Sequence, residues 1–153
     1  MGQGCVFEEG TRVFHPENVY LGDRVYIGHQ SILKGYYQNH MRIGHDVWVG
    51  PQCFLHSAGG IDIEDLVGIG PGVRILSSVH QETAPPEPII LAPLRFAPVF
   101  IGRGADIGTS ATVLPGVRIR QGAQIGAGAV VTEDIPDYAI AVGVPAKVLR
   151  TRS

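Results

Sequence analysis

Charged residues are scarce in this sequence of 153 residues: Asp, Glu, Lys and Arg make up 17%, against roughly 25% in an ordinary soluble domain. The 12 basic and 14 acidic residues leave a formal charge of −2, which argues against a nucleic-acid partner or an anionic membrane surface. No apolar run approaches the roughly 18 residues of a membrane-spanning helix, and the first residues lack the basic and apolar regions of a secretion signal. We therefore expect a cytoplasmic protein, one domain over residues 1–153, without membrane insertion.

Cysteine is also rare, with Cys5 and Cys53 alone. Their separation fits neither a disulfide framework nor the paired ligands of a zinc site, so no metal is predicted. Glycine and proline are abundant instead, at 21 and 11 residues, and both disfavour long helices.

Aliphatic residues recur every six positions. The three runs are Leu21, Ile27 and Leu33; Ile43, Val49, Leu55, Ile61, Val67, Val73 and Val79; and Ile101, Ile107, Val113, Ile119, Ile125 and Val131. The residues four positions further on are mostly small, and glycine often follows the aliphatic residue directly. A period of six is typical of short strands joined by tight turns, three of which close one triangular coil. The sequence predicts an all-β parallel prism of a little over five coils.

The interruptions of this period predict where the chain leaves the prism. The spacings 33–43 and 79–101 each exceed a multiple of six by four residues. The first excursion is expected at residues 35–41. The second, at 81–98, carries five prolines and should form a stiff, extended arm, because proline cannot join the interior of a ladder. Residues 136–153 should form a last strand and a tail.

The repeat, the proline-rich arm, the stretch from Ile107 to Pro136 and the tail Gly143-Val-Pro-Ala-Lys-Val-Leu-Arg150 together resemble the hexapeptide-repeat acetyltransferases. More narrowly, they resemble the galactoside, maltose and xenobiotic O-acetyltransferase branch. The resemblance covers the chain from Leu21 to Arg150. It implies a left-handed parallel β-helix, a homotrimer, and acetyl-CoA bound between neighbouring prisms. The handedness comes only from the resemblance.

His80 is the candidate catalytic base, because it directly follows Val79 where the prism gives way to the arm. Acyl transfer to a hydroxyl needs a group that accepts a proton near neutral pH, and imidazole supplies this. The string Ile75-Leu-Ser-Ser-Val-His80 matches the place of the catalytic histidine in the resembling family. His56 is the competing histidine, interpreted as structural. Glu82, Glu87 or a backbone carbonyl are open as the partner that orients His80.

The resemblance also implies contacts for acetyl-CoA. Thr109 and Ala127, one coil of 18 residues apart, would line the channel; Thr132 would lie near the adenosine; Lys147 and Arg150 would reach the phosphates. The sequence differs from the branch at Asp106, where tryptophan is usual, and at Glu133, where lysine is common. The Gly- and Ala-rich stretch 125–131 also serves tight packing between coils.

The acceptor is expected to be a small molecule: a sugar hydroxyl, on a free sugar or a nucleotide-sugar, as in a precursor of a surface polysaccharide. Tyr36, Tyr37, Asn39 and His40 in the first excursion are candidates for binding it. The alternative reaction is N-acetylation of a nucleotide-linked amino sugar. A nucleophilic Cys53 is disfavoured, because its position in the repeat is that of a buried filler.

Two further functions share the architecture. A non-enzymatic β-helix scaffold would need neither His80 nor the basic tail. A zinc-dependent γ-type carbonic anhydrase has a Gly-His-x4-His pattern, which Gly28-His29 begins but Lys34 ends, and a protonated amine is no zinc ligand.

Overall fold

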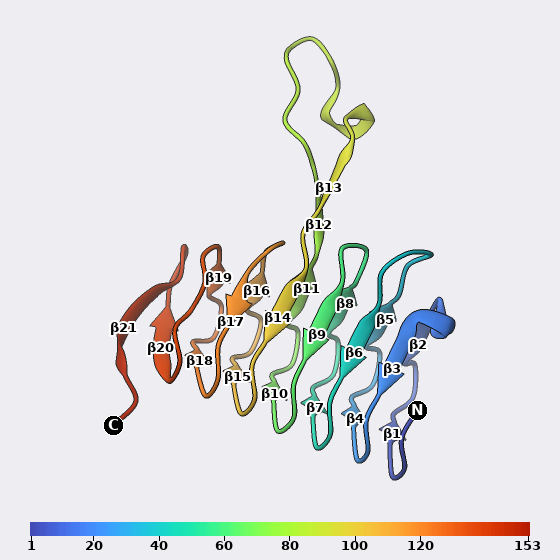
Figure 1. The fold of residues 1–153 in the computed structure, drawn as a ribbon, viewed down its shortest axis with the longest axis vertical. Helices are drawn as coiled ribbons and strands as arrows, with labels where there is room; N and C mark the ends of the chain where they lie inside the picture. The colour runs from blue at the N-terminus through green and yellow to red at the C-terminus, as the bar shows by residue number, and fades with distance from the viewer.

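Short strands stack into three parallel sheets that form the sides of a triangular prism in the computed structural model, which describes residues 1–153 (Figure 1). Sheet A contains β1 (Val6–Phe7), β4 (Tyr26–Ile27), β7 (Trp48–Val49), β10 (Gly68–Ile69), β15 (Asp106–Ile107), β18 (Gln124–Ile125) and β20 (Ala139–Val142), and ends with the antiparallel β21 (Lys147–Thr151). Sheet B contains β2 (Arg12–Phe14), β5 (Ile32–Lys34), β8 (Phe54–His56), β11 (Arg74–Leu76), β16 (Thr112–Val113) and β19 (Val130–Val131). Sheet C contains β3 (Val19–Leu21), β6 (Met41–Ile43), β9 (Ile61–Ile63), β14 (Val99–Ile101) and β17 (Arg118–Ile119).

The six-residue period has the structural meaning expected of it. Ile27, Leu33, Val49 and Leu55 are wholly buried, and residues at the same place in successive coils pair across the ladder, as Ile107 does with Ile125. The predicted β-helix with a protruding proline-rich loop is confirmed, and its left-handed sense is that of the hexapeptide-repeat fold. No helix in the structure has the length and apolar character needed to span a bilayer.

The prism has about seven turns, two more than the sequence pattern indicated. The extra turns lie at the ends. Phe7 and Val13 pair with Ile27 and Leu33 in a first coil, and Ala141 pairs with Ile125 in a last one. These coils escaped the search for bulky aliphatic residues because phenylalanine and alanine occupy inward positions there. The tail also differs from expectation, because β21 folds back along β20 as a strand.

Glycine at the edges of the prism allows successive turns to touch. A Cβ on Gly108 would lie 2.6 Å from the backbone nitrogen of Ala127 in the next coil, and one on Gly50 would lie 2.7 Å from that of Pro71. Neither distance is tolerable for a side chain next to backbone. The glycines that follow the inward aliphatic residues at this edge are therefore required by close packing between coils.

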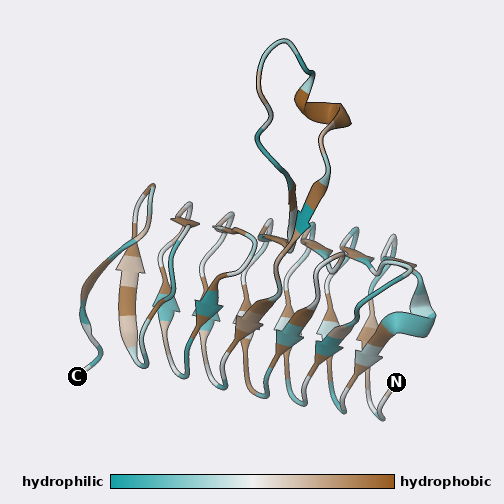
Figure 2. Ribbon diagram, turned by 45° about the horizontal axis from the view of Figure 1, so that its top comes forward, coloured by the Kyte–Doolittle hydropathy of each residue, from teal (hydrophilic) through white to brown (hydrophobic).

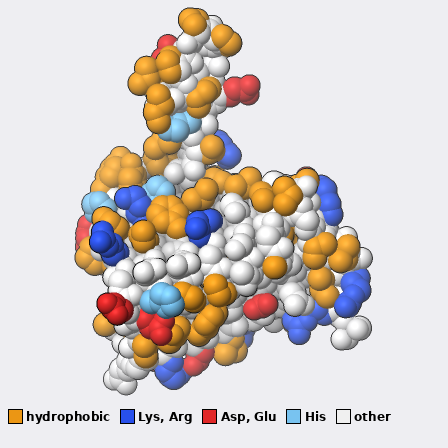
Figure 3. All heavy atoms as spheres, turned by 180° about the vertical axis from the view of Figure 1, so that it is seen from behind, with side chains coloured by type: hydrophobic (Ala, Val, Ile, Leu, Met, Phe, Trp, Pro, Cys, Tyr) orange, Lys and Arg blue, Asp and Glu red, His pale blue; other side chains and the backbone are white.

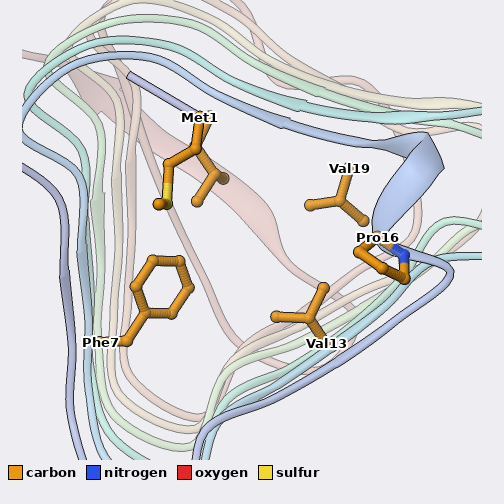
Figure 4. Close-up of a pocket in the computed structure, with 6 residues that line it drawn as sticks. Met1, Phe7, Val13, Pro16 and Val19 are labelled. Atoms are coloured by element: carbon orange, nitrogen blue, oxygen red, sulfur yellow. The ribbon is translucent and has the colours of Figure 1, made fainter. Parts of the chain in front are cut away.

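The core meets solvent at the N-terminal end of the prism. A cavity of about 230 Å³ opens there, lined by Met1, Phe7, Val13, Pro16, Val19 and Leu21 (Figure 4). The 3-10 turn η1 (Pro16–Asn18) borders it. Its side chains are apolar, so the cavity contains no group suited to catalysis.

The arm leaves the prism between sheets B and C. Its lower part is a two-stranded antiparallel ribbon of β12 (Ser78–His80) and β13 (Leu94–Phe96), and its upper part includes the 3-10 turn η2 (Ile89–Leu91) (Figure 1). The segment between the two strands of the ribbon contains Pro85, Pro86, Pro88 and Pro93. The arm therefore stands out from the edge of the prism, with His80 at the top of its ribbon.

Candidate functional site

His80 is held by a backbone carbonyl. It lies opposite Leu94 in the ribbon, and its Nδ1 is 3.0 Å from the carbonyl oxygen of Ala92. A carbonyl oxygen only accepts hydrogen bonds, so Nδ1 carries the proton and donates it. Nε2 of the neutral ring then has a free lone pair, which is the arrangement a general base requires. Of the three partners left open by the sequence, the structure has the carbonyl; neither Glu82 nor Glu87 hydrogen-bonds to His80.

The foot of the arm is anchored by Ser77. Its buried hydroxyl donates to the carbonyl of His56 (2.6 Å) and accepts from the backbone amide of Gly59 (2.9 Å), while its own carbonyl accepts from the amide of Ala97 (2.9 Å). A Cβ on Gly59 would come within 2.7 Å of the Ala97 nitrogen and closer still to the Ser77 carbonyl. Ser77 and Gly59 thus fix where the ribbon starts, and with it the position of His80.

Aromatic side chains gather at this foot from three segments of the chain. The ring of Tyr36 lies 4.5 Å from that of Tyr37, 5.9 Å from the imidazole of His56 and 6.3 Å from the ring of Phe96, measured between centroids. Phe54 lies 5.9 Å from His56. These separations are typical of interacting rings. We call these five residues the aromatic cluster.

Only two of the four residues of the first excursion that were predicted to bind the acceptor belong to this cluster. Tyr36 and Tyr37 join it, but the amide of Asn39 donates to the carbonyl of Ala58 (2.6 Å) and so serves the backbone. His40 turns toward sheet C, where its Nε2 lies 3.6 Å from a carboxylate oxygen of Asp62. The sequence did not indicate Phe54 and Phe96, because nothing local links them to residue 36.

His56 is a neutral member of the cluster. Burial, and secondarily the charge of Lys34, lowers the pKa of its imidazole below the usual value. Its Nε2 is buried and has no hydrogen-bond partner. A histidine in this state packs as an aromatic ring, and His80, with its carbonyl partner, is the better placed of the two for proton transfer.

The residues implied for acetyl-CoA fall into two groups. Thr109 and Ala127 lie at the edge between sheets A and B in consecutive coils, where the amide of Gly128 donates to the carbonyl of Thr109 (2.8 Å). Both are exposed, and a Cβ on Gly128 would meet nothing within 4 Å. This edge is therefore lined by small residues with open space outside it.

The second group lies near the C-terminal end. Thr132 precedes Glu133, whose carboxylate is 3.7 Å from the Nζ of Lys147. Glu133 thus pairs with the amine of Lys147, which the resemblance assigns to binding of the CoA phosphates. Arg150, on β21, contacts only the carbonyl of Thr151 (3.4 Å), so its guanidinium is otherwise free. Asp106 is exposed on β15, next to Gly68 in sheet A.

One copy of the chain does not bring His80 together with Thr109 and Ala127. The arm rises from the edge between sheets B and C, whereas Thr109 and Ala127 lie at the edge between sheets A and B. A ligand that lies along the edge between sheets A and B therefore does not lie beside the His80 ribbon of the same copy.

The other candidate chemistries have little support in the geometry. Burial raises the pKa of the Cys53 thiol, whose sulfur lies 3.2 Å from the carbonyl of Gly70, so this residue is a packed thiol. His29 lies 3.4 Å from Glu8, and the Nζ of Lys34 lies 4.6 Å from the ring centre of Phe14. No three His, Cys, Asp or Glu side chains come together as metal ligands.

Comparison with known proteins gives relatives named as acetyltransferases. A Mycobacterium tuberculosis protein is 33% identical over 132 residues, which are 86% of this chain and 44% of that protein. A Staphylococcus aureus protein is 36% identical over 120 residues, 72% of this chain and 54% of that protein. A tetrahydropyridine-dicarboxylate N-acetyltransferase of Enterococcus faecalis is 48% identical over 61 residues, 40% of this chain and 26% of that protein. The chain spans about half the length of the first two relatives.

Solved structures share the fold. A single-residue mutant of AntD, an N-acyltransferase from Bacillus cereus, in complex with dTDP and coenzyme A, aligns over 99% of this chain and 83% of its own with a TM-score of 0.88 at 22% identity. A maltose O-acetyltransferase from Clostridium difficile aligns over 99% of this chain and 71% of its own, with a TM-score of 0.68 at 27% identity. No family model matches the sequence.

The stacked six-residue coils and the arm define a hexapeptide-repeat β-helix. The chain is similar in sequence to proteins named as acetyltransferases, and its structural neighbours include a maltose O-acetyltransferase, which confirms the resemblance to the hexapeptide-repeat acetyltransferases.

Proposed function

We propose that the protein transfers an acetyl group from acetyl-CoA to a sugar hydroxyl, directly and in a ternary complex, with His80 as the general base. The observation that carries this proposal is the hydrogen bond from Nδ1 of His80 to the carbonyl of Ala92, which leaves Nε2 free to accept a proton. The acetyltransferase relatives supply the reaction class.

The proposed chemistry requires little of the protein beyond proton transfer and positioning. Acetyl-CoA supplies an activated thioester carbonyl. Nε2 of His80 accepts the proton of the acceptor hydroxyl as its oxygen bonds to the carbonyl carbon, and returns this proton to the thiolate sulfur as the carbon–sulfur bond breaks. The carbonyl of Ala92 holds the imidazole in the required tautomer and stabilises the imidazolium that forms in between.

The small-residue edge fits an extended thioester arm. Thr109 and Ala127 would hold the pantetheine portion against exposed backbone, with Thr132 beside the adenosine and Lys147 and Arg150 at the phosphates. The open space outside Gly128 supports this assignment. Coenzyme A is bound in the Bacillus cereus neighbour, which has the same fold.

A homotrimer would complete the site. His80 and the small-residue edge lie at different edges of one prism, so a base and a thioester can meet only if the arm of one copy faces that edge of another. The tip of the arm supports this arrangement, because Ile89, Ile90 and Leu91 are 50%, 73% and 69% exposed (Figure 2). Apolar side chains gathered on a protruding turn are typical of a surface that another chain covers.

The test of the base is His80→Ala, with thiol release from acetyl-CoA as the readout. We expect turnover to fall by about 10²-fold or more while the affinity for CoA is unchanged, because a general base acts in the transition state. His56→Ala and His40→Ala are the matched controls. A loss caused by His56→Ala and not by His80→Ala would show that the wrong histidine has been assigned.

The test of the assembly is the mass in solution together with the response to CoA. Three chains of 16.3 kDa each are expected, and CoA should raise the melting temperature by mass action. A monomer that does not respond to millimolar CoA would contradict both the trimer and the assigned CoA residues.

N-acetylation is the second candidate reaction, favoured by the 48% identity with an N-acetyltransferase over 61 residues. A neutral amine needs less help from a base than a hydroxyl does. A panel of sugars, amino sugars and nucleotide-sugars distinguishes the two. Preference for an amino sugar with little loss in His80→Ala would replace O-acetylation by N-acetylation.

A further inference from the structure

The outer face of sheet A has a gap at Gly68. This glycine lies in the ladder between Trp48 and Asp106, one strand from each. A Cβ at Gly68 would have only the carboxylate of Asp106 within 4 Å, with Oδ1 at 2.7 Å and Cγ at 3.8 Å. No backbone atom of another coil is that close, in contrast to the corner glycines Gly50 and Gly108. Packing between coils therefore does not require a glycine here, and the missing side chain leaves open space on the surface.

One wall of this gap is an indole ring. Trp48 stacks on Tyr26, with the ring centroids 5.9 Å apart and the planes inclined by 6°. Tyr26 is the ladder partner of Trp48 on the side away from Gly68, so it covers one face of the indole and leaves the other face turned toward the gap. Trp48 is 44% exposed. The stacked pair is thus a preformed aromatic platform whose free face borders the gap.

The opposite wall is a carboxylate without a partner. Asp106 is the only Asp, Glu, Lys or Arg residue in the seven parallel strands of sheet A. At the corner between sheets C and A, by contrast, Asp46 binds the guanidinium of Arg24 (2.8 Å). Asp65 binds that of Arg103 in the same way (2.9 Å). The hydrogen bonds and ion pairs of the protein leave the Asp106 carboxylate free.

The two walls together suit a positive charge. Seen from behind, hydrophobic side chains and an acidic one lie on the lower half of the prism, with white surface between them (Figure 3). Strands two steps apart in a ladder are separated by about 9.6 Å, and the Asp106 carboxylate reaches back over Gly68. A small group in contact with the indole, about 3.5–4 Å from the ring, therefore also lies beside the carboxylate. The face of an indole attracts cations, and so does a carboxylate.

We propose that Trp48, Gly68 and Asp106 form a binding slot for an organic cation with an alkylated ammonium head. The methyl groups of such a head pack on the indole, while its charge lies next to Asp106. Because the methyl groups keep water away from the charge, this head loses less hydration on binding than a primary ammonium does. The slot would hold a ligand besides acetyl-CoA and the acceptor, and the inference does not depend on the acetyl transfer proposed above.

The protein itself reports binding in this slot, because Trp48 is its only tryptophan. The experiment titrates the protein with choline, without acetyl-CoA, and follows the tryptophan emission. The matched ligand is 3,3-dimethylbutan-1-ol, which has the same shape as choline with a neutral carbon in place of nitrogen. We expect choline to bind at least about tenfold more tightly. Equal affinities would show that the slot recognises apolar surface alone and would overturn the inference, as would an unchanged emission.

Asp106→Asn removes the charge and nearly keeps the shape. Its affinity for choline should fall by about tenfold, whereas that for the neutral alcohol should not change. Asp137→Asn is the matched control, because Asp137 is also an exposed carboxylate but lies outside sheet A. Equal choline affinity in Asp106→Asn and the wild type would contradict the assignment of the carboxylate.

Gly68→Leu tests the gap. Its Cβ would meet only the movable carboxylate of Asp106, so the fold should be kept, and its side chain should fill the space beside the indole. Choline binding should be lost without a fall in the melting temperature, since a leucine suits a strand better than a glycine does. Retained binding would show that choline binds elsewhere.

Methylguanidinium tests the shape of the head. It is a flat cation, and we expect it to bind more weakly than choline, because its N–H groups lie in its own plane and cannot reach a carboxylate on the far side from the indole. Tighter binding of methylguanidinium would overturn the assigned class of ligand. No step of these titrations uses acetyl-CoA, so a failure of the slot and a failure of the acetyl transfer are separate results.

Discussion

In the body of the prism the side chain of Leu55 is wholly buried, whereas Ile90 at the tip of the arm is 73% exposed. Each coil of the body is hydrogen-bonded to the coils before and after it, and its aliphatic residues fill a continuous core. The arm has one short ribbon and a proline-rich segment, and it depends on Ser77 and Gly59 at its foot.

This difference separates stability from function within one small chain. The body should provide nearly all of the free energy of unfolding, because it contains the buried apolar surface. The arm contributes little burial but positions His80. Changes in the body should therefore alter stability first, and changes at the foot of the arm should alter turnover beyond their effect on stability.

The largest effect is expected for Leu55→Ala, which leaves a cavity in the core of the body. Substitutions of this kind cost about 2–5 kcal/mol of unfolding free energy. Denaturant unfolding measures this cost, and turnover well below the melting temperature should be nearly normal. Leu149→Ala, at a 66% exposed leucine, is the control and should change stability by less than about 0.5 kcal/mol. A small cost for Leu55→Ala would contradict the assignment of stability to the body.

Gly59→Ala tests the junction of body and arm. Its new Cβ would collide with the backbone of Ser77 and Ala97, so the ribbon must shift, at a cost of about 1–3 kcal/mol. Turnover should fall by at least about tenfold, because His80 moves with the ribbon. Gly102→Ala is the matched control: its Cβ would lie 2.6 Å from the nitrogen of Gln121, at the corner between sheets C and A and not at the edge from which the arm leaves. Equal turnover in the two variants would show that the foot does not position His80.

Glu133→Lys extends the comparison to the C-terminal end of the body. The substitution removes the anion that pairs with Lys147 and adds a second cation. Because both side chains are well exposed, the gain in CoA affinity should be only a few-fold, about 1 kcal/mol or less, and should fade as salt is added. Titration with CoA measures it, with Glu9→Lys at the other end of the prism as control. An unchanged affinity would remove Lys147 from the phosphate site.

The smallest effect is a pH dependence that arises at the junction. Burial, and then Lys34, lowers the pKa of His56 in the folded chain, so the unfolded chain binds the proton first as the pH falls. Above the unfolded-state pKa of about 6.5, the neutral imidazole of His56 does not reduce the free energy of unfolding. Below that pH the unfolded chain takes up the proton more readily, and the free energy of unfolding falls. Melting temperatures at pH 7.5, 6.5 and 5.5 should fall less steeply in His56→Phe than in the wild type. An identical slope would show that this imidazole is not held neutral.

The repeat could be predicted from the sequence because each inward position is set locally. Val49, Leu55 and Ile61 follow one another at the spacing of one strand and one corner, and nothing distant is needed to recognise them. The end coils could not be recognised in this way. Phe7 and Val13 are six residues apart, but Val13 and Leu21 are eight apart, so the first coil is out of phase with the run that begins at Leu21. Ala141 in the last coil is too small to provide an aliphatic signal.

The site was predictable only in part. His80 could be singled out, because it lies where the period breaks. Its carbonyl partner could not, since the arm must fold back on itself before Ala92 reaches the imidazole. Tyr36 and Tyr37 were candidates as part of a surface loop, but the contacts of Tyr36 with His56 and Phe96 bridge 20 and 60 residues of chain.

The sequence by itself determined the parallel prism, its inward residues, and the two places where the chain leaves it, because a six-residue period depends only on neighbours along the chain. The tertiary structure alone decided which side chains share a surface. Stacking places residues about one coil apart at the separation of a single ladder step, so Lys34, His56 and Leu76 lie side by side. Where excursions of unequal length separate the coils, only the folded chain shows which residues of different coils meet.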